Sequence, residues 1–195
     1  MPAIRTKSQL PAMASPTAFP VTHAAAALGV LAALALAVPA GAQTMHRSPH
    51  MEETANIVGL KGGFVSAFSQ GQSRVGGGLG PFYERNVIPG WLELEAAMVF
   101  TWIEDETVIG FDLFAKKPFH VNELVNPYVG LGPNVSIIFR PEETIARFGI
   151  LATAGSYFWF RESSWGLDLE VVYLLLFDSD LIHELAVEFG PVFRF

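Results

Sequence analysis

The chain has 195 residues, of which 51% are hydrophobic and only 16% carry a charge, and its formal net charge at pH 7 is −7. An acidic protein has to overcome phosphate repulsion to bind nucleic acid, so we expect no nucleic-acid partner. The chain contains no cysteine, which excludes disulfide bonds, thiolate metal sites, cysteine catalysis and a lipid-modified N-terminal cysteine. The length and the even composition predict a single domain.

The N-terminus has the features of an export signal. Arg5 and Lys7 supply positive charge near the start, an apolar run extends from Ala24 to Ala40, and Ala40-Gly41-Ala42 has the small-x-small form of a cleavage site. Cleavage after Ala42 would remove two bases and no acid, so the net charge would change from −7 to −9.

We therefore predict a signal peptide over residues 1–42, a polar N-terminal lead over 43–54 and a folded domain over 55–195. The alternative is an uncleaved anchor helix, because the apolar run is almost long enough to span a bilayer.

Eight segments in which apolar and more polar side chains alternate follow the lead. A period of two is that of a β-strand with one apolar face. Their predicted bounds are Ala55–Phe64, Gly76–Asn86, Trp91–Trp102, Val108–Ala115, Asn126–Phe139, Phe148–Phe160, Trp165–Phe177 and Leu185–Phe195. Most are close to the ~9–11 residues that a tilted strand needs to cross a bilayer.

The residues between these segments are typical of turns and loops. We predict loops over Val65–Arg74, Lys116–Glu123, Arg140–Arg147 and Asp178–Glu184, and tight turns at Ile88–Gly90, Glu104–Glu106 and Arg161–Ser164. The glycines of the second segment leave its facing ambiguous. Its run Gly76-Gly77-Gly78-Leu79-Gly80 lacks the Lys-Ser/Thr of a phosphate-binding loop, so we interpret it as bending the strand.

The last segment ends the chain on an aromatic residue. Glu188, Gly190, Phe193 and Phe195 resemble the C-terminal assembly signal of Gram-negative outer-membrane barrels. Together with Tyr128-Val129-Gly130-Leu131-Gly132 and Trp165-Gly166-Leu167-Asp168-Leu169-Glu170, this segment makes the chain similar to the small eight-stranded barrels of the OmpA-like group.

The resemblance implies an all-β fold: an eight-stranded antiparallel up-and-down transmembrane β-barrel in the cell outer membrane. Because the chain ends at the barrel, we expect no periplasmic domain after it. The resemblance also implies contact with outer-membrane lipid and lipopolysaccharide and with the barrel-assembly machinery, and no cofactor. An even strand count leaves both termini on one side of the membrane. We expect Trp91, Trp159, Trp165, Phe193 and Phe195 at that rim, and Trp102, Phe139 and Phe177 at the other. The alternative is a soluble periplasmic barrel with an apolar ligand inside.

A charge that faces hydrocarbon costs ~2–4 kcal/mol at the bilayer midplane, so the charged residues of the strands should point inward. These predicted interior residues are Lys61, Glu93, Glu95, Asp112, Asp168, Glu170, Glu188 and Arg194. Six acids face two bases, so either some carboxylates are protonated or further bases such as Arg85 and Lys116 reach inward. The acids suggest a proton or ion path, but the width of an eight-stranded barrel favours an interior filled by its own side chains.

The last loop offers the one constellation suited to catalysis. Ser179 could attack an ester, His183 could act as its base and Asp178, Asp180 or Glu184 could orient the histidine. A polar turn explains the same residues. Lipid A deacylases with eight strands carry a His-x-Ser motif on a late strand, whereas the triplet here, His46-Arg47-Ser48, lies near the N-terminus.

Metal binding has weak support in the sequence. His120 and His183 have no partner at metal-ligand spacing. Carboxylates in the loops of one end could hold Ca²⁺ or Mg²⁺ against lipopolysaccharide phosphates, although no coordinating spacing is evident. These residues are Glu104, Asp105, Glu106, Glu142, Glu143, Asp178, Asp180 and Glu184.

The sequence thus predicts a non-enzymatic outer-membrane barrel with a role in envelope integrity, surface interaction or narrow solute or ion passage. We predict no catalytic, cofactor or metal residue for it. The alternative function is a lipid-modifying hydrolase or acyltransferase that uses the last loop.

Overall fold

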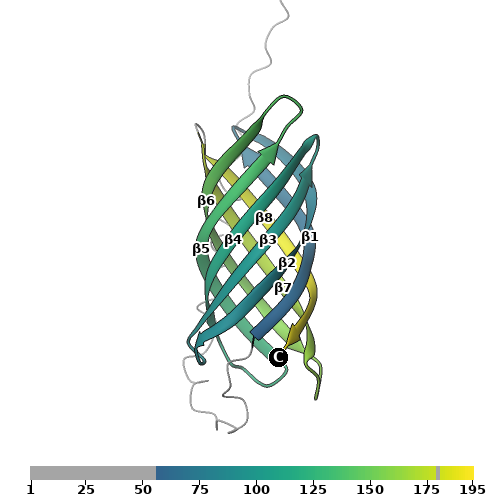
Figure 1. Cartoon of the computed structure of the whole chain (residues 1–195), viewed down its shortest axis with the longest axis vertical. Helices are drawn as coiled ribbons and strands as arrows, with labels where there is room; N and C mark the ends of the chain where they lie inside the picture. Colours follow the sequence, from purple (N-terminus) through teal and green to yellow (C-terminus); the bar gives the residue numbers. More distant parts are fainter. Residues whose placement is uncertain (1–55, 179–180) are drawn as a thin grey trace, which may run out of the picture.

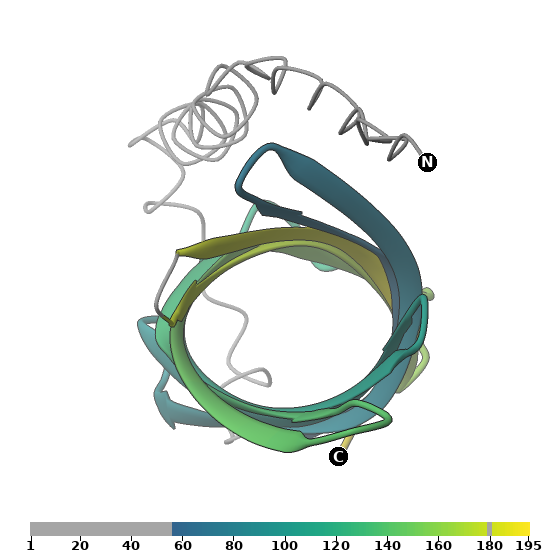
Figure 2. The same ribbon diagram turned by 90° about the horizontal axis from the view of Figure 1, so that it is seen from above.

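The computed structural model describes residues 56–178 and 181–195, and these form a closed antiparallel β-barrel (Figure 1, Figure 2). The strands are β1 (Asn56–Ser69), β2 (Gln72–Ile88), β3 (Leu92–Ile103), β4 (Glu106–Pro118), β5 (Val125–Phe139), β6 (Thr144–Trp159), β7 (Trp165–Phe177) and β8 (Ile182–Arg194). Each strand pairs with its neighbours in sequence, and β1 pairs with β8. The prediction of an eight-stranded up-and-down barrel is confirmed.

The first and last described residues meet at one end of the barrel, which we call the terminal end. The Asn56 amide donates to the Phe195 carbonyl at 3.0 Å, and the Phe195 amide donates to the Asn56 carbonyl at 2.9 Å. The predicted signal peptide and polar lead lie outside the described residues. In the part of the chain that is described, no helix is long and apolar enough to cross a membrane.

Several predicted loops are shorter than expected because the strands extend into them. The loop predicted over Val65–Arg74 is wrong: only Gln70 and Gly71 separate β1 from β2, and both have positive φ angles, 47° and 77°. Ser and Gln suggested a loop here, but Val65 and Ala67 are buried inside the barrel and continue the alternation. For the same reason the loops predicted after β4, β5 and β7 lose residues to the strands.

The outer surface of the barrel is apolar. Large exposed side chains include Phe64, Leu94, Phe111, Leu131 and Phe148. On the described strands, the charged residues that the alternation of side chains places on the outer face are Arg85 of β2 and Lys117 of β4. Both lie close to the terminal end of the barrel. An apolar wall between polar rims is the exterior of a transmembrane barrel. The soluble alternative, which needs the opposite facing, is therefore wrong.

Aromatic residues surround both ends of this wall. Trp91, Trp165 and Phe195 are exposed at the terminal end, and Trp102, Phe139 and Phe177 are exposed at the opposite end. Trp159 differs from the expectation of a membrane-facing belt residue. It is 5% exposed because it lies on the inner face of β6, where it packs against Tyr157 with ring centroids 5.7 Å apart.

Three Gly-Pro steps interrupt the ladder of backbone pairs. They are Gly80-Pro81 between β2 and β3, Gly132-Pro133 between β5 and β4, and Gly190-Pro191 between β8 and β1. Proline has no N–H to donate, so the carbonyl opposite it lies close to the preceding glycine instead. A Cβ added to Gly132 would lie 1.7 Å from the Leu113 oxygen, so only glycine fits there.

Candidate functional site

The centre of the barrel contains a lysine from β1 that is surrounded by carboxylates. The Lys61 Nζ atom donates hydrogen bonds to Glu170 Oε1 at 2.6 Å and to Glu95 Oε1 at 3.0 Å. It also lies 3.3 Å from Asp168 Oδ2. The Lys61 side chain is 6% exposed, so the lysine is buried and neutralised by residues of β3 and β7.

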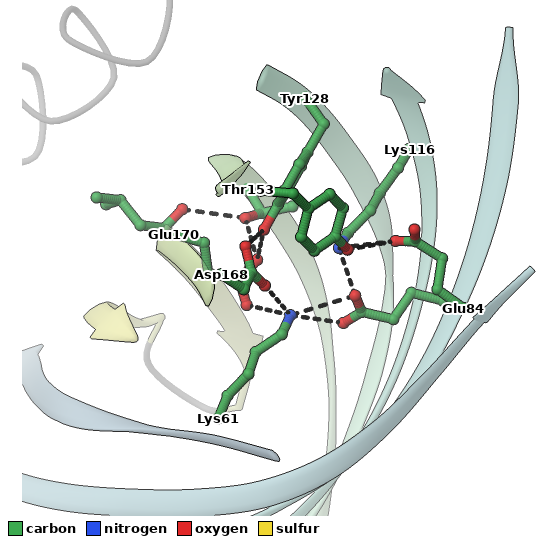
Figure 3. A network of polar contacts seen from close by, with 10 residues as sticks. Lys61, Glu84, Lys116, Tyr128, Thr153, Asp168 and Glu170 are labelled. Atoms are coloured by element: carbon green, nitrogen blue, oxygen red, sulfur yellow. Dashed lines mark hydrogen bonds and ion pairs between the residues drawn. The ribbon is translucent and has the colours of Figure 1, made fainter. Parts of the chain in front are cut away.

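A second lysine reaches the same level from β4. Lys116 is fully buried, forms an ion pair with Glu95, and lies with its Nζ atom 3.1 Å from Glu84 Oε2. Glu95 therefore links the two lysines. Figure 3 shows Lys61 beside Asp168 and Lys116 near Glu84 within this network. The Lys116 ammonium also lies 4.0 Å from the centroid of the Tyr128 ring, a distance at which a cation is attracted to an aromatic face.

Hydroxyl groups supply the remaining donors. The Tyr128 hydroxyl lies 2.8 Å from Asp168 Oδ1 and 2.9 Å from Glu170 Oε2. Thr153 donates to Glu170 Oε2 at 3.0 Å, and Tyr157 donates to Glu84 Oε2 at 2.8 Å. We call this network the ionic layer; its members are Lys61, Glu84, Glu95, Lys116, Tyr128, Thr153, Tyr157, Asp168 and Glu170. They come from seven of the eight strands, β1 to β7.

Glycines beside the lysines leave room for the long side chains to cross the interior. Gly80 is opposite Lys61 in the β1–β2 ladder, and Gly130 is opposite Lys116 in the β4–β5 ladder. A Cβ at Gly130 would lie 3.0 Å from Lys116 Cγ. Gly80, one of the glycines that hid the facing of β2 in the sequence, thus lies directly opposite one of the two lysines.

Apolar side chains close the interior on the terminal side of the ionic layer. Ile57, Phe82, Trp159 and Val192 are buried there, together with the two tyrosine rings. The Arg194 guanidinium lies 4.6 Å from the Trp159 ring centroid and donates to the Ser163 carbonyl at 3.2 Å. Arg194 therefore covers this aromatic group at the rim of the barrel.

The opposite side of the ionic layer is less completely filled. Two cavities of about 20 and 60 Å³ lie there, and Asp112 and Glu188 line both. Asn134 donates to Asp112 Oδ1 at 2.6 Å. Cavities of this size hold a few water molecules, since one water needs a cavity volume of about 10–15 Å³ when the volume open to the centre of the water is counted. They are too small for an ordinary solute.

The structure distributes the predicted interior residues over several places. Lys61, Glu95, Asp168 and Glu170 belong to the ionic layer, Asp112 and Glu188 line the cavities, and Arg194 lies at the terminal end. Glu93 is half-buried beside Glu84. Of the assembly-signal residues, Glu188 and Gly190 are on the inner face of β8, and the rings of Phe193 and Phe195 stack with centroids 6.1 Å apart.

Sequence reasoning missed several members of the ionic layer. Glu84 was hidden by the ambiguous facing of the glycine-rich strand, and the register settles it, because Glu84 is directly opposite Glu95. Lys116 is one of the two further bases that were considered, and it does point inward. The predicted loop over Lys116–Glu123 was wrong for this residue, because Lys116 lies in β4. Arg85 is exposed on the outer face, so the idea that it reaches inward is wrong.

The constellation considered for catalysis is not brought together. The His183 Nδ1 atom lies 2.6 Å from the Tyr173 hydroxyl on the outer face, whereas Glu184 lines the larger cavity inside. Neighbouring residues of a strand point to opposite faces, so Glu184 cannot orient His183. Asp178 is paired with Arg147. Ser179 and Asp180 lie outside the described residues.

Arginines bind several of the carboxylates considered for ion bridging. Glu106 accepts from Arg140 at 2.8 Å and pairs with Arg74 at 2.9 Å, and Arg140 also pairs with Glu143 at 3.1 Å. Within residues 56–178 and 181–195, no three His, Asp or Glu side chains are grouped so that they could hold a metal. The glycine run from Gly76 to Gly80 lies within β2.

The closed fold, the apolar wall and the charged interior define a transmembrane β-barrel of the outer-membrane type. Among solved structures, Neisserial surface protein A matches with a TM-score of 0.61 and 15% identity, over 73% of this chain and 100% of its own. Ail, the attachment invasion locus protein of Yersinia pestis, matches with 0.52 and 16%, over 72% and 99%. The N-terminal barrel of Pseudomonas aeruginosa OprF matches with 0.50 and 16%, over 73% and 100%.

These likenesses confirm the resemblance to small eight-stranded outer-membrane barrels at the level of the fold. No protein-family model matches the sequence, and no curated protein does.

Proposed function

We propose that the protein is a non-enzymatic barrel of the outer membrane that supports the integrity of the envelope. In this role the barrel spans the membrane without forming an open pore. The observation that carries this proposal is the ionic layer, in which buried ion pairs and hydrogen bonds join side chains of seven strands across the interior. An eight-stranded barrel has room for little else. A role in bulk diffusion would need an open interior, which these side chains occupy.

Short connections favour envelope integrity over adhesion through long loops. At the end opposite the termini, two residues separate β1 from β2 and two separate β3 from β4. Ion pairs of Arg74 and Arg140 with Glu106 tie three of the four hairpins together. We infer that the partners are the surrounding lipids and lipopolysaccharide, contacted by the apolar wall, and the assembly machinery that inserts the barrel.

The experiment that tests this role is a permeability assay on a strain that lacks the gene. We expect greater entry of a large hydrophobic dye and greater sensitivity to detergent, both restored by the wild-type gene. Unchanged permeability in the deletion strain would contradict the proposal. A change in lipid A acylation on deletion would favour the hydrolase instead.

A further inference from the structure

Two buried oxygen atoms on β2 have no hydrogen-bond partner among the described residues. They are Glu84 Oε1 and Asn86 Oδ1. The two residues are two positions apart and therefore share the inner face of the strand. Glu84 is 1% exposed. A buried acceptor that stays unsatisfied costs ~1–3 kcal/mol, so two of them on one face of the strand point to a missing donor or cation.

A third acceptor lies next to them on β3. Glu93 is directly opposite Asn86 in the ladder, and its carboxyl group is within hydrogen-bonding reach of Glu84. The other Glu84 oxygen is already satisfied, because it accepts from Tyr157 at 2.8 Å and lies 3.1 Å from Lys116 Nζ. The three groups thus bring two carboxyl groups and an amide oxygen together on the inner face of β2 and β3.

The nearby lysines do not fill this role. Lys116 is directed to Glu95 and to the satisfied Glu84 oxygen. Lys117 lies near Glu93, but its Nζ atom donates to the Gly90 carbonyl at 2.8 Å. Lys61 forms ion pairs with Glu95, Asp168 and Glu170. No lysine is therefore hydrogen-bonded to Glu84 Oε1 or to Asn86 Oδ1.

We propose that Glu84 Oε1, Asn86 Oδ1 and the Glu93 carboxylate bind a divalent cation of the Ca²⁺ type at the terminal end of the ionic layer. Carboxylate and amide oxygens are the ligands that this hard cation prefers, and water completes its shell. Glu93 is half-buried, so the cation can enter from that end. The β2–β3 register shifts between Asn86 and Ile88, next to the site.

A second pair of acids provides a matched control. Glu188 is within hydrogen-bonding reach of Glu170, as Glu93 is of Glu84. Both Glu170 oxygens already have donors, Lys61 on one and Tyr128 with Thr153 on the other. The pair of Glu170 and Glu188 therefore resembles the site in charge but offers no free buried oxygen.

The test is isothermal titration of the refolded full chain with CaCl₂, in detergent without lipopolysaccharide and at constant ionic strength. We expect saturable binding to a single site in the wild type and in Glu188→Gln. Glu93→Gln and Asn86→Ala should each weaken that binding about tenfold or more, because the first removes a carboxylate charge and the second removes a ligand oxygen. Heat-shifted gel mobility checks that each variant is folded.

Absence of calcium binding by the wild type would overturn the proposal, whatever the variants do. A proton shared between Glu84 and Glu93 in place of the cation gives that result. Wild-type affinity in both Glu93→Gln and Asn86→Ala would overturn it as well, because the ion would then be bound elsewhere.

Discussion

Lys61 and Glu170 form an ion pair with 2.6 Å between Nζ and Oε1, although the two residues are 109 positions apart in the chain. The pair joins β1 to β7 across the interior, and Glu95 on β3 binds the same ammonium group. Barrel closure and the ionic layer therefore depend on each other. The strands bring the charges together, and the ion pairs offset the cost of burying the charges of this layer.

Replacement of Lys61 by methionine should destabilise the barrel strongly. The change leaves Glu95, Asp168 and Glu170 buried together without their shared cation, and loss of one partner of a buried ion pair costs ~3–5 kcal/mol. Urea unfolding in detergent measures the effect. Arg85→Met, a change on the exposed outer face, is the control and should leave the unfolding midpoint nearly unchanged. Equal midpoints for both variants would show that Lys61 is not buried among carboxylates.

Alanine at Gly132 should destabilise the wall of the barrel. The added Cβ would lie 1.7 Å from the Leu113 oxygen, so β4 and β5 would have to separate locally. We expect a loss of ~1–3 kcal/mol, as for other overpacked positions. Gly77→Ala is the matched control, because its nearest neighbour would be the Gly63 oxygen at 3.5 Å. A Gly132→Ala barrel as stable as the control would contradict the close approach at the Gly-Pro step.

Removal of Phe195 should impair closure between β1 and β8. Its amide and carbonyl form the two backbone hydrogen bonds with Asn56, and its side chain belongs to the predicted assembly signal. Phe195→Ala keeps the backbone bonds and separates the two contributions. Membrane fractionation with boiled and unboiled gel samples measures assembly. We expect outer-membrane recovery and a heat-dependent shift for the wild type, and loss of both after removal of Phe195.

A chain that fractionates as a soluble protein and is indifferent to loss of Phe195 would refute the membrane assignment itself. If Phe195→Ala assembles normally and the truncated chain does not, the backbone pairing with Asn56 is the important feature. If both fail, the aromatic side chain is needed for recognition.

The strand count could be predicted from the sequence because alternation persists through each strand. Lys61 and Glu95 stand out in such a pattern. A charged side chain that faced the lipid would be costly, so a charged residue in an alternating strand is expected on the inner face. Strand ends were harder: Ser66 and Ser69 are polar, yet β1 includes them. Polar residues near the rim of a barrel carry too little hydrophobic contrast to mark where a strand stops.

The partners within the ionic layer could not be predicted. Tyr157 and Glu84 are hydrogen-bonded across 73 positions, and their contact depends on the register and tilt of strands that are not neighbours. Trp159 shows the same limit. Its position near a rim suggested a lipid-facing ring, but the phase of β6 turns it inward over Arg194.

The ionic layer as a closed barrier is tested most directly by conductance in planar lipid bilayers. We predict no steady conductance for the wild-type barrel. The double variant Lys61→Ala and Lys116→Ala, which shortens both crossing side chains and leaves the acids, should open a cation-selective path where it still folds. A steady, cation-selective current through the wild-type protein would contradict a closed interior and favour narrow ion passage as its function.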